Sequence, residues 1–392
     1  SGGGRMLDDI AMDHDVPDDP IAAVTHPDPY GYYARLRRER PLHRDPALGV
    51  WVASSAAAVT AVLTSPACRV RPAAEPVPTP LAGSPAGEIF RHLVRMSDGD
   101  AHRTHRRAVA TMLEAFDGTR PVRESERWAR RLADGIGPAS ASARLAQFAF
   151  AIPVSVVGSL LGCADEELPM IVELVGRFVR CIAPGGTPEQ HSSGMRAAGE
   201  LRERMLGSLT RRGIPDTSDA VVANAIGLMT QSYDATAGLI GTTLLTLARQ
   251  PAVHARVAES PALLDAVIDE VLRYDSPVQN TRRFVAEPVT IEAETLSPGD
   301  AVLLLLAAAN RDPAANADPD RFHLTRHDRR LFTFGVGAHA CPGRAIATTI
   351  ARAAVAGLLD NGVRPDGLDP RPAYRPSANS RIPMLGWKSV RA

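Results

Sequence analysis

One long apolar segment limits what this chain can fold into. Residues 219–250 read DAVVANAIGLMTQSYDATAGLIGTTLLTLARQ and are apolar almost all round at both ends. A helix of that kind in a soluble protein is normally buried, so we expect it to cross the protein centre. A polar island, TQSYDAT at 230–236, interrupts the segment. Buried polar groups are costly unless they are satisfied, so the island indicates water, a ligand or a functional role.

The remaining sequence predicts a mainly α protein with a small β region. Helical pattern covers much of the chain, in the ranges 29–41, 102–116, 122–212 with a break at 183–188, 260–277 and 343–362. Strand-like pieces occur at 41–54, 282–296 and 301–310, and a loop rich in Pro and Gly occupies 77–87. We interpret 1–15 as a flexible N-terminal leader and 16–392 as a single domain, because no repeat or interdomain linker divides them.

Charge and cysteine content exclude several classes of partner. Lys and Arg total 44 and so do Asp and Glu, which leaves no excess charge to favour nucleic acid or a membrane surface. The four cysteines, at 68, 163, 181 and 341, lack the paired spacing of a disulfide framework or a zinc ribbon. The apolar run 301–309 is about half of the ~20 residues that a membrane helix needs. We therefore predict a soluble cytoplasmic protein.

The stretch FGVGAHACPG, residues 334–343, is the strongest candidate for a functional site. Its glycines let the backbone adopt positive φ angles and approach a flat or bulky group closely. Cys341 falls directly before a helix-forming run, where unpaired N–H groups and the positive end of the helix dipole favour an anion. A thiolate in that position could serve as a nucleophile or as a metal ligand.

Four interpretations of Cys341 compete. A lone cysteine is most often a small buried hydrophobe. A nucleophile would need a base, and His339 is two residues away, but no convincing triad orders it against the sulfur. A zinc site would need three or four ligands, which no local motif supplies. Haem iron needs one protein ligand, a flat approach surface and cations for its propionates, and the glycines with the nearby His and Arg residues fit that demand best.

The motif resembles the haem-binding loop of the cytochrome P-450 family, and the likeness runs from about residue 29 to the C-terminus. The residues that fall on the family's pattern are Phe334, Gly335, Gly337, His339, Cys341 and Gly343. The resemblance implies the cytochrome P-450 fold, haem b (iron protoporphyrin IX) as cofactor, and Cys341 as the ligand of the iron.

Basic residues elsewhere resemble the family's propionate anchors. His102 and Arg106 lie one helical turn apart and match its H-x-x-x-R pattern, while His339 matches the histidine of the thiolate loop. Arg283 matches the propionate arginine of a strand, with its neighbour Arg282 as the rival. Charge-assisted hydrogen bonds suit a dianionic cofactor, and one such cofactor explains these residues jointly.

The polar island of the central segment matches the family's oxygen-activating helix. Asp234 takes the place of the acid that relays protons, and Ala235 stands where most members have threonine. An alanine methyl cannot supply the hydroxyl of that threonine. A substrate hydroxyl, an ordered water or Thr236 at a local bulge could take the place of the threonine hydroxyl. Alternatively, the reaction needs less proton delivery. Gln231 and Ser232 replace a small pair, so the helix kink could differ as well.

Two further features complete the comparison. Glu270 and Arg273 form an E-x-x-R pair, and the resemblance implies a third, structural partner that we assign to Arg321 in DPDRF. Pro342 follows the ligand directly and has no N–H, so one potential hydrogen bond to the thiolate is lost. We hypothesise that the sulfur then donates more charge to the iron and lowers its reduction potential.

The resemblance implies a monooxygenase that uses dioxygen to hydroxylate or epoxidise a small organic molecule, by analogy an intermediate of secondary metabolism. Electrons would come from NAD(P)H through a separate ferredoxin and ferredoxin reductase, docking near Arg344 and the basic run 103–107. Two rivals remain: a related enzyme that couples or rearranges its substrate without oxygen insertion, and a non-catalytic haem-binding protein. The substrate pocket is predicted to draw on 77–95, 168–200, 279–281 and 382–385.

Overall fold

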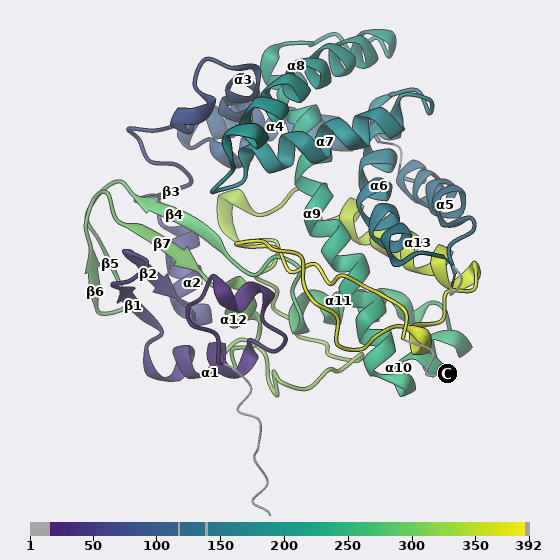
Figure 1. Cartoon of the computed structure of the whole chain (residues 1–392). Helices are drawn as coiled ribbons and strands as arrows, with labels where there is room; N and C mark the ends of the chain where they lie inside the picture. Colours follow the sequence, from purple (N-terminus) through teal and green to yellow (C-terminus); the bar gives the residue numbers. More distant parts are fainter. Residues whose placement is uncertain (1–15, 117, 138–139, 389–392) are drawn as a thin grey trace, which may run out of the picture.

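The protein is represented by a computed structural model that describes residues 16–116, 118–137 and 140–388. The leader predicted at 1–15 lies outside these residues. Helices dominate the described chain and surround one long central helix, with a small sheet at one side (Figure 1). The prediction of a mainly α fold with a small β region is confirmed.

The long apolar segment forms the helix α9, Asp219–Arg249, which is largely buried along its length. It packs against the helices α3 (Pro85–His92), α4 (Gly99–Glu114), α6 (Ser142–Leu161), α11 (Leu263–Tyr274) and α13 (Arg344–Asp360). Gly238 shows how closely other chain segments approach it, because a Cβ there would lie 2.8 Å from the carbonyl oxygen of Arg381. The central position predicted from its all-round apolarity is confirmed.

The other helices follow the predicted pattern closely. They are α1 (Tyr30–Glu39), α2 (Ala56–Thr64), α5 (Arg120–Ala133), α7 (Leu168–Ile182), α8 (Pro188–Arg211), α10 (Pro251–Glu259) and α12 (Leu306–Asn310). The predicted loop at 77–87 is shorter than expected, because α3 begins at Pro85. Ser84 caps that helix by accepting a hydrogen bond from the backbone N–H of Gly87, and proline suits the first helical position.

The main sheet has five strands in the order β1-β2-β7-β4-β3. Their bounds are β1 (Leu42–Asp45), β2 (Val50–Ala53), β3 (Cys68–Arg69), β4 (Thr281–Val285) and β7 (Ala301–Leu304), and β5 (Val289–Ile291) pairs separately with β6 (Glu294–Leu296). Strands β2 and β7 run parallel, while the other neighbours are antiparallel. The apolar run after Ala301 was expected to be strand throughout, but its alanine-rich second half forms α12, as the high helix propensity of alanine favours.

A buried ionic network fixes the region behind α11. The fully buried Glu270 carboxylate accepts from Arg273 at 2.7 Å, from Arg329 at 2.9 Å and from Arg326 at 3.2 Å. Burial raises the pKa of Glu270, but the hydrogen bonds from Arg273 and Arg329 outweigh it and hold the pKa below its ordinary value. The assignment of Arg321 as the third ionic partner is wrong: its backbone carbonyl, not its guanidinium, faces this network and accepts from Arg273 at 3.0 Å.

Among the described helices, α6 alone is long and apolar enough to cross a membrane by length and composition. Two-thirds of its apolar window is buried inside the fold, with α5, α7, α9 and α13 packed against it. Burial among other helices accounts for its composition, so α6 is a core helix.

Candidate active site

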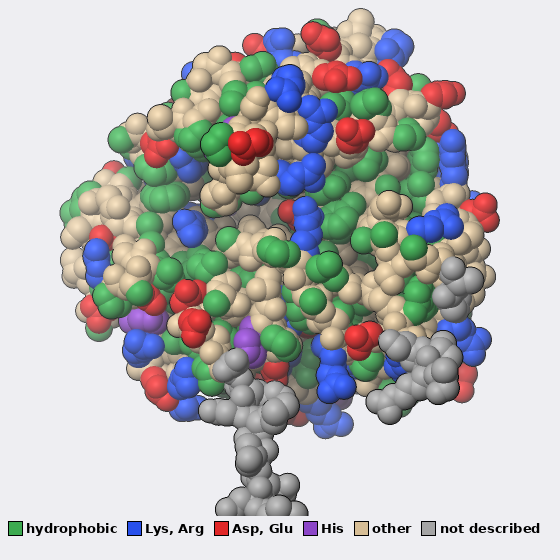
Figure 2. Space-filling model, viewed as in Figure 1, with side chains coloured by type: hydrophobic (Ala, Val, Ile, Leu, Met, Phe, Trp, Pro, Cys, Tyr) green, Lys and Arg blue, Asp and Glu red, His purple; other side chains and the backbone are tan. Residues whose placement is uncertain are grey.

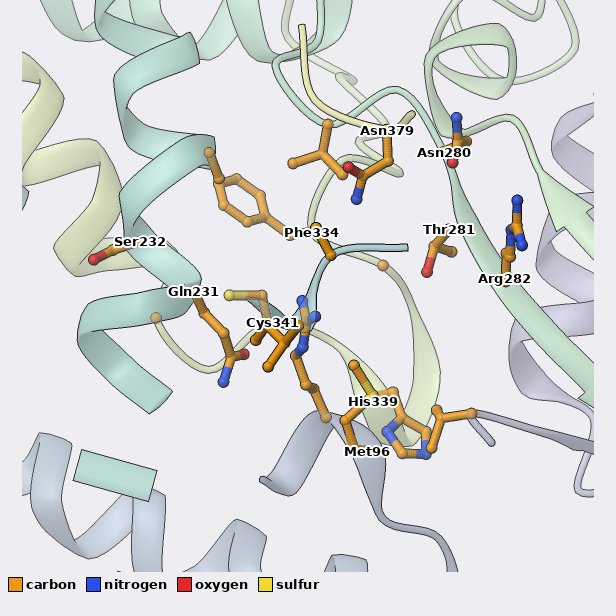
Figure 3. Close-up of a pocket in the computed structure, with 18 of the residues that line it drawn as sticks. Met96, Gln231, Ser232, Asn280, Thr281, Arg282, Phe334, His339, Cys341 and Asn379 are labelled. Carbon is orange, nitrogen blue, oxygen red and sulfur yellow. The ribbon is translucent and has the colours of Figure 1, made fainter. Parts of the chain in front are cut away.

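A cavity of about 770 Å³ lies beside the central helix. One wall comes from α9, the opposite wall from β4, and the loop 333–343 lies between them (Figure 3). The connection between α7 and α8 and the segment around residues 378–379 complete the enclosure. On the face shown in Figure 2, the surface is hollowed between the α7–α8 region and the sheet.

Cys341 faces this cavity from the loop that precedes α13. Gly335 and Gly337 adopt φ angles of 68° and 76°, and the backbone N–H of Cys341 donates to the carbonyl of Phe334 at 2.8 Å. These features fold the loop so that the sulfur is exposed to the cavity although protein surrounds it. The positive φ angles predicted for the glycines of this loop are confirmed at Gly335 and Gly337.

The sulfur environment departs from the expectation of a stabilised thiolate. Burial raises the pKa of the Cys341 thiol, although the backbone N–H of Gly343 and the charge of Arg106 oppose this shift. Desolvation therefore outweighs the hydrogen bond and the charge that oppose it, and a metal ion bound to the sulfur would take the place of its proton. No group of three or more His, Cys, Asp or Glu within the described ranges could hold a bare metal ion. The cavity thus suits a metal that brings its own other ligands.

The predicted propionate anchors meet at one edge of the cavity. His339 lines it, and its ring lies 4.1 Å from that of His102. Arg106 donates to the carbonyl of Ala340 in the same loop. Asp98, which sequence reasoning missed, lies 3.3 Å from Nε2 of His339. Only the fold reveals this aspartate, because no motif distinguishes it from other acids.

Arg283 provides the test of whether an anionic cofactor fits. Its side chain is buried and lines the cavity, and within the described residues its hydrogen bond runs from Nη1 to the carbonyl of Arg282. Its Nε is buried without a partner in the described structure, and desolvation lowers its pKa. A buried unpaired guanidinium is costly, so an anion such as a propionate would satisfy it. The residues present therefore fit haem.

One member of the predicted anchor set is not cationic. Desolvation, followed by the charges of His339 and Arg106, lowers the pKa of His102 to about 4. The ring is therefore neutral near pH 7 and can donate a single hydrogen bond to an anion, without contributing charge.

The polar island of α9 divides between the cavity and the protein interior. Gln231, Ser232, Ala235 and Thr236 line the cavity, and Figure 3 shows Gln231 on the α9 side, across the cavity from Thr281 on β4. The helix continues through the island without interruption, so Thr236 reaches the cavity without the local bulge we had considered. The helix therefore needs no kink to bring Thr236 to the cavity.

Asp234 does not line the cavity. Its carboxylate lies 3.0 Å from Nη1 of Arg375, in the C-terminal segment, and that guanidinium also stacks on Phe150 of α6 at 4.6 Å. Burial raises the pKa of Asp234, and Arg375 only partly opposes the shift. Nothing in the sequence around Arg375 pointed to this contact, because it joins residues far apart in the chain.

The predicted substrate-lining segments are partly correct. Segments 77–95 and 168–200 contribute, and so do Asn280 and Thr281, whereas Gln279 is buried away from the cavity in hydrogen bonds with Tyr33 and the Ser276 carbonyl. The described residues 382–385 do not line it, and Ala378 and Asn379 do so instead. A bridge between Val278 and Ser380 aligns the two segments and brings Ala378 and Asn379 beside Asn280.

Comparisons with known proteins agree with this geometry. The family model described as "Cytochrome P450" matches residues 210–361. A putative cytochrome P450 133B2 of Xylella fastidiosa is 30% identical over 302 residues, covering 70% of this chain and 74% of that relative. Cytochrome P450 monooxygenase PikC of Streptomyces venezuelae is 30% identical over 357 residues, covering 85% and 83%.

Solved structures share the whole architecture. The crystal structure of CalO2 matches with a TM-score of 0.79 and 25% identity, covering 95% of this chain and 99% of that one. A P450BioI in complex with an acyl carrier protein carrying hexadec-9Z-enoic acid matches with a TM-score of 0.78 and 23% identity, covering 91% and 97%. At that identity the second likeness concerns the fold alone.

Proposed function

This chain belongs to the cytochrome P450 family, and from that premise we propose that it is a haem-thiolate monooxygenase with Cys341 as the proximal iron ligand. The observation that carries the proposal is the sulfur of Cys341 facing a cavity whose lining also holds the buried guanidinium of Arg283, with its Nε unpaired. A sulfur and a buried cation on one cavity match two parts of a haem, the iron and the propionates.

The bound haem would supply the activation of dioxygen. Cys341 would hold the iron, and Phe334, Gly335 and Gly343 would let the flat ring approach the loop closely. Arg283, Arg106, His339 and the neutral His102 would hold the propionates by hydrogen bonds. Gly343 keeps a backbone N–H on the sulfur, which limits how much charge the sulfur can donate.

On the other side of the cavity, α9 would bind substrate and control protons. Ala235 and Thr236 present a methyl and a hydroxyl to the cavity, while Asp234 holds an ionisable carboxyl just behind them. The raised pKa of Asp234 suits a group that takes up and releases a proton during turnover. Arg375 would orient that carboxyl.

The partners follow from the same premise. Electrons would pass from NAD(P)H through a ferredoxin reductase and a ferredoxin that docks near Arg344 and the basic run 103–107. The substrate would be a small organic molecule. Two relatives from Streptomyces, named 20-oxo-5-O-mycaminosyltylactone 23-monooxygenase and cytochrome P450 monooxygenase PikC, support an intermediate of secondary metabolism as that substrate. We place the protein in the cytoplasm, with no nucleic-acid or membrane partner.

The test is the absorption spectrum of the purified, reduced protein with carbon monoxide. Thiolate ligation predicts a strongly red-shifted Soret band, and Cys341→Ser should abolish that band. Cys163→Ser is the matched control, because that buried cysteine lies outside the cavity lining and should leave the spectrum unchanged. A colourless protein that stays colourless with added haemin, or an unshifted band, would reject the proposal.

Ala235 supports a second candidate, oxidative coupling or rearrangement without oxygen insertion. The methyl group cannot donate the hydrogen bond that a threonine hydroxyl would supply at this position. Products formed under isotopically labelled dioxygen separate the two candidates, since a labelled hydroxyl or epoxide excludes pure coupling. Ligand-dependent consumption of electrons with formation of a changed substrate would exclude a non-catalytic haem protein.

A further inference from the structure

We propose that Arg95 binds a carboxylate of the substrate, so that the enzyme acts on an organic acid. The inference rests on the proposed function, because it names the class of molecule that the cavity takes. It stands on three observations: an unpaired cation that lines the cavity, a backbone beneath it that is fixed by hydrogen bonds, and a cavity lining that offers it no internal anion.

Arg95 is an unpaired cation on the cavity. It lies in a short 3-10 turn, Val94–Met96, that leads into α4, and its side chain lines the cavity. Its surface is accessible, yet desolvation by the surrounding protein lowers its pKa, so the accessible surface is cavity and not open solvent. No hydrogen bond or ion pair joins its side chain to another residue in the described ranges.

The turn that carries Arg95 is held firmly from both sides. On the α9 side, the buried amide of Asn224 accepts from the N–H of Val94 at 2.8 Å and donates to the carbonyl of His92 at 2.7 Å. On the α4 side, the Ser97 hydroxyl contacts Nδ1 of His105 at 3.0 Å. These hydrogen bonds fix the backbone at Arg95, so the position from which its side chain reaches the cavity is set before a ligand binds.

The cavity offers Arg95 no internal partner. Glu75 is the only Asp or Glu among the residues that line it within the described structure. Its carboxylate is already engaged by the backbone N–H and the hydroxyl of Thr79, at 2.9 and 3.1 Å. The nearby Arg71 adds a further cation and donates to the backbone carbonyl of Glu75. The lining therefore carries a cationic excess that a substrate anion would neutralise.

The propionate edge is served by other residues. At that edge His339 and Arg106 lower the pKa of His102 and Asp98 raises it, and Asp98 also raises the pKa of Arg283. Desolvation is what lowers the pKa of Arg95, which shares none of these interactions. A guanidinium can donate two parallel hydrogen bonds to a carboxylate, which matches an organic acid better than a neutral head group.

The experiment measures the change in the absorption spectrum of the haem-loaded enzyme as ligands are added, from which the dissociation constant of each ligand is obtained. The probes are dodecanoate, 4-phenylbutyrate and the methyl ester of each. For the wild-type enzyme we expect at least one acid to bind about tenfold or more tightly than its ester, the range of one charge-assisted hydrogen bond. Arg95→Gln should remove that preference by weakening the acid alone, and Arg95→Lys should restore part of it.

The matched control is Arg91→Gln. Arg91 lies four positions earlier on α3, pairs with Glu88 at the surface, and does not line the cavity. This variant should keep the acid preference of the wild-type enzyme. Thermal unfolding and haem content of each variant establish that it is folded and loaded.

Three results would overturn the inference. The first is that acid and ester bind the wild-type enzyme equally, or that neither binds up to its solubility limit. The second is an acid preference that survives Arg95→Gln, and the third is a loss of haem from a folded Arg95→Gln variant. The last would assign Arg95 to the propionates. Failure of the proposed function is distinct, because it would appear as absent thiolate ligation in the wild-type enzyme before any ligand is added.

Discussion

Arg375 Nη1 lies 3.0 Å from a carboxylate oxygen of Asp234, which joins the C-terminal segment to the middle of the central helix. The two residues are 141 positions apart. Both side chains are largely shielded from solvent, and Phe150 packs against the guanidinium. The contact therefore ties the orientation of the proposed proton-handling carboxyl to a segment that also supplies Ala378 and Asn379 to the cavity.

The first prediction concerns this pair. Arg375→Gln removes a cation that opposes the raised pKa of Asp234, so that pKa should rise further. If the ionised carboxylate is needed, the acidic limb of the pH–turnover profile should move to higher pH. Asp234→Asn should lower product formation by about a hundredfold, typical of losing a proton-transfer group. Arg371→Gln on the same segment is the control, and an unmoved acidic limb in Arg375→Gln would contradict the assignment.

A second prediction tests the anchor of the cofactor. Arg283→Gln should weaken haem retention roughly tenfold, because it removes a charge-assisted hydrogen bond from a buried position. Arg282→Gln, next to it on β4 but exposed, should have the smaller effect. The measurement is the transfer of haem to apomyoglobin as a function of time. Equal losses in the two variants, or the larger loss in Arg282→Gln, would reassign the anchor.

The ionic network at Glu270 predicts a loss of stability. Glu270→Gln leaves Arg273, Arg326 and Arg329 without their buried counter-ion and should cost about 3–5 kcal/mol in the free energy of unfolding at pH 7. Glu259→Gln, on the exposed end of α10, should cost little. Denaturant unfolding of both variants provides the comparison.

The same network predicts the sign of a pH dependence. The folded state holds the pKa of Glu270 below its unfolded value, so its contribution is present above the unfolded pKa of about 4.3. That contribution is lost as the pH falls through the lower, folded pKa. The stability difference between wild type and Glu270→Gln should therefore shrink on acidification below that range, and a constant difference would refute the pairing.

Ala235 predicts a gain of function. Ala235→Thr places a hydroxyl on the cavity wall beside Thr236. If proton delivery limits the wild-type enzyme, the fraction of electrons that end in oxygenated product should rise, measured as product formed per NAD(P)H consumed. Ala235→Val, which has a similar shape without a hydroxyl, should not reproduce that rise.

Pro342 predicts a shift in reduction potential. Replacing Pro342 by Leu restores a backbone N–H beside the sulfur, in addition to the one that Gly343 provides. A more strongly hydrogen-bonded sulfur donates less charge to iron, so the potential should rise, as measured by spectroelectrochemical titration. An unchanged or lower potential would reject the hypothesis.

By itself, the sequence determined the helical class, the central position of α9 and the cavity-facing Cys341. These features depend on local information: apolar residues all round a long segment, and glycines at the positions where the loop adopts positive φ. The same holds for the buried pair of Glu270 and Arg273, whose helical spacing brings them together wherever the helix lies.

Only the tertiary structure decided which distant residues meet. Arg375 reaches Asp234, Arg329 replaces Arg321 beside Glu270, and Asn224 holds the turn of Arg95 across the fold. Such contacts depend on how helices and terminal segments pack, and a single sequence carries no periodic signal for them. The desolvation that raises the pKa of Cys341 and lowers that of Arg95 likewise arises only when the chain folds around its cavity.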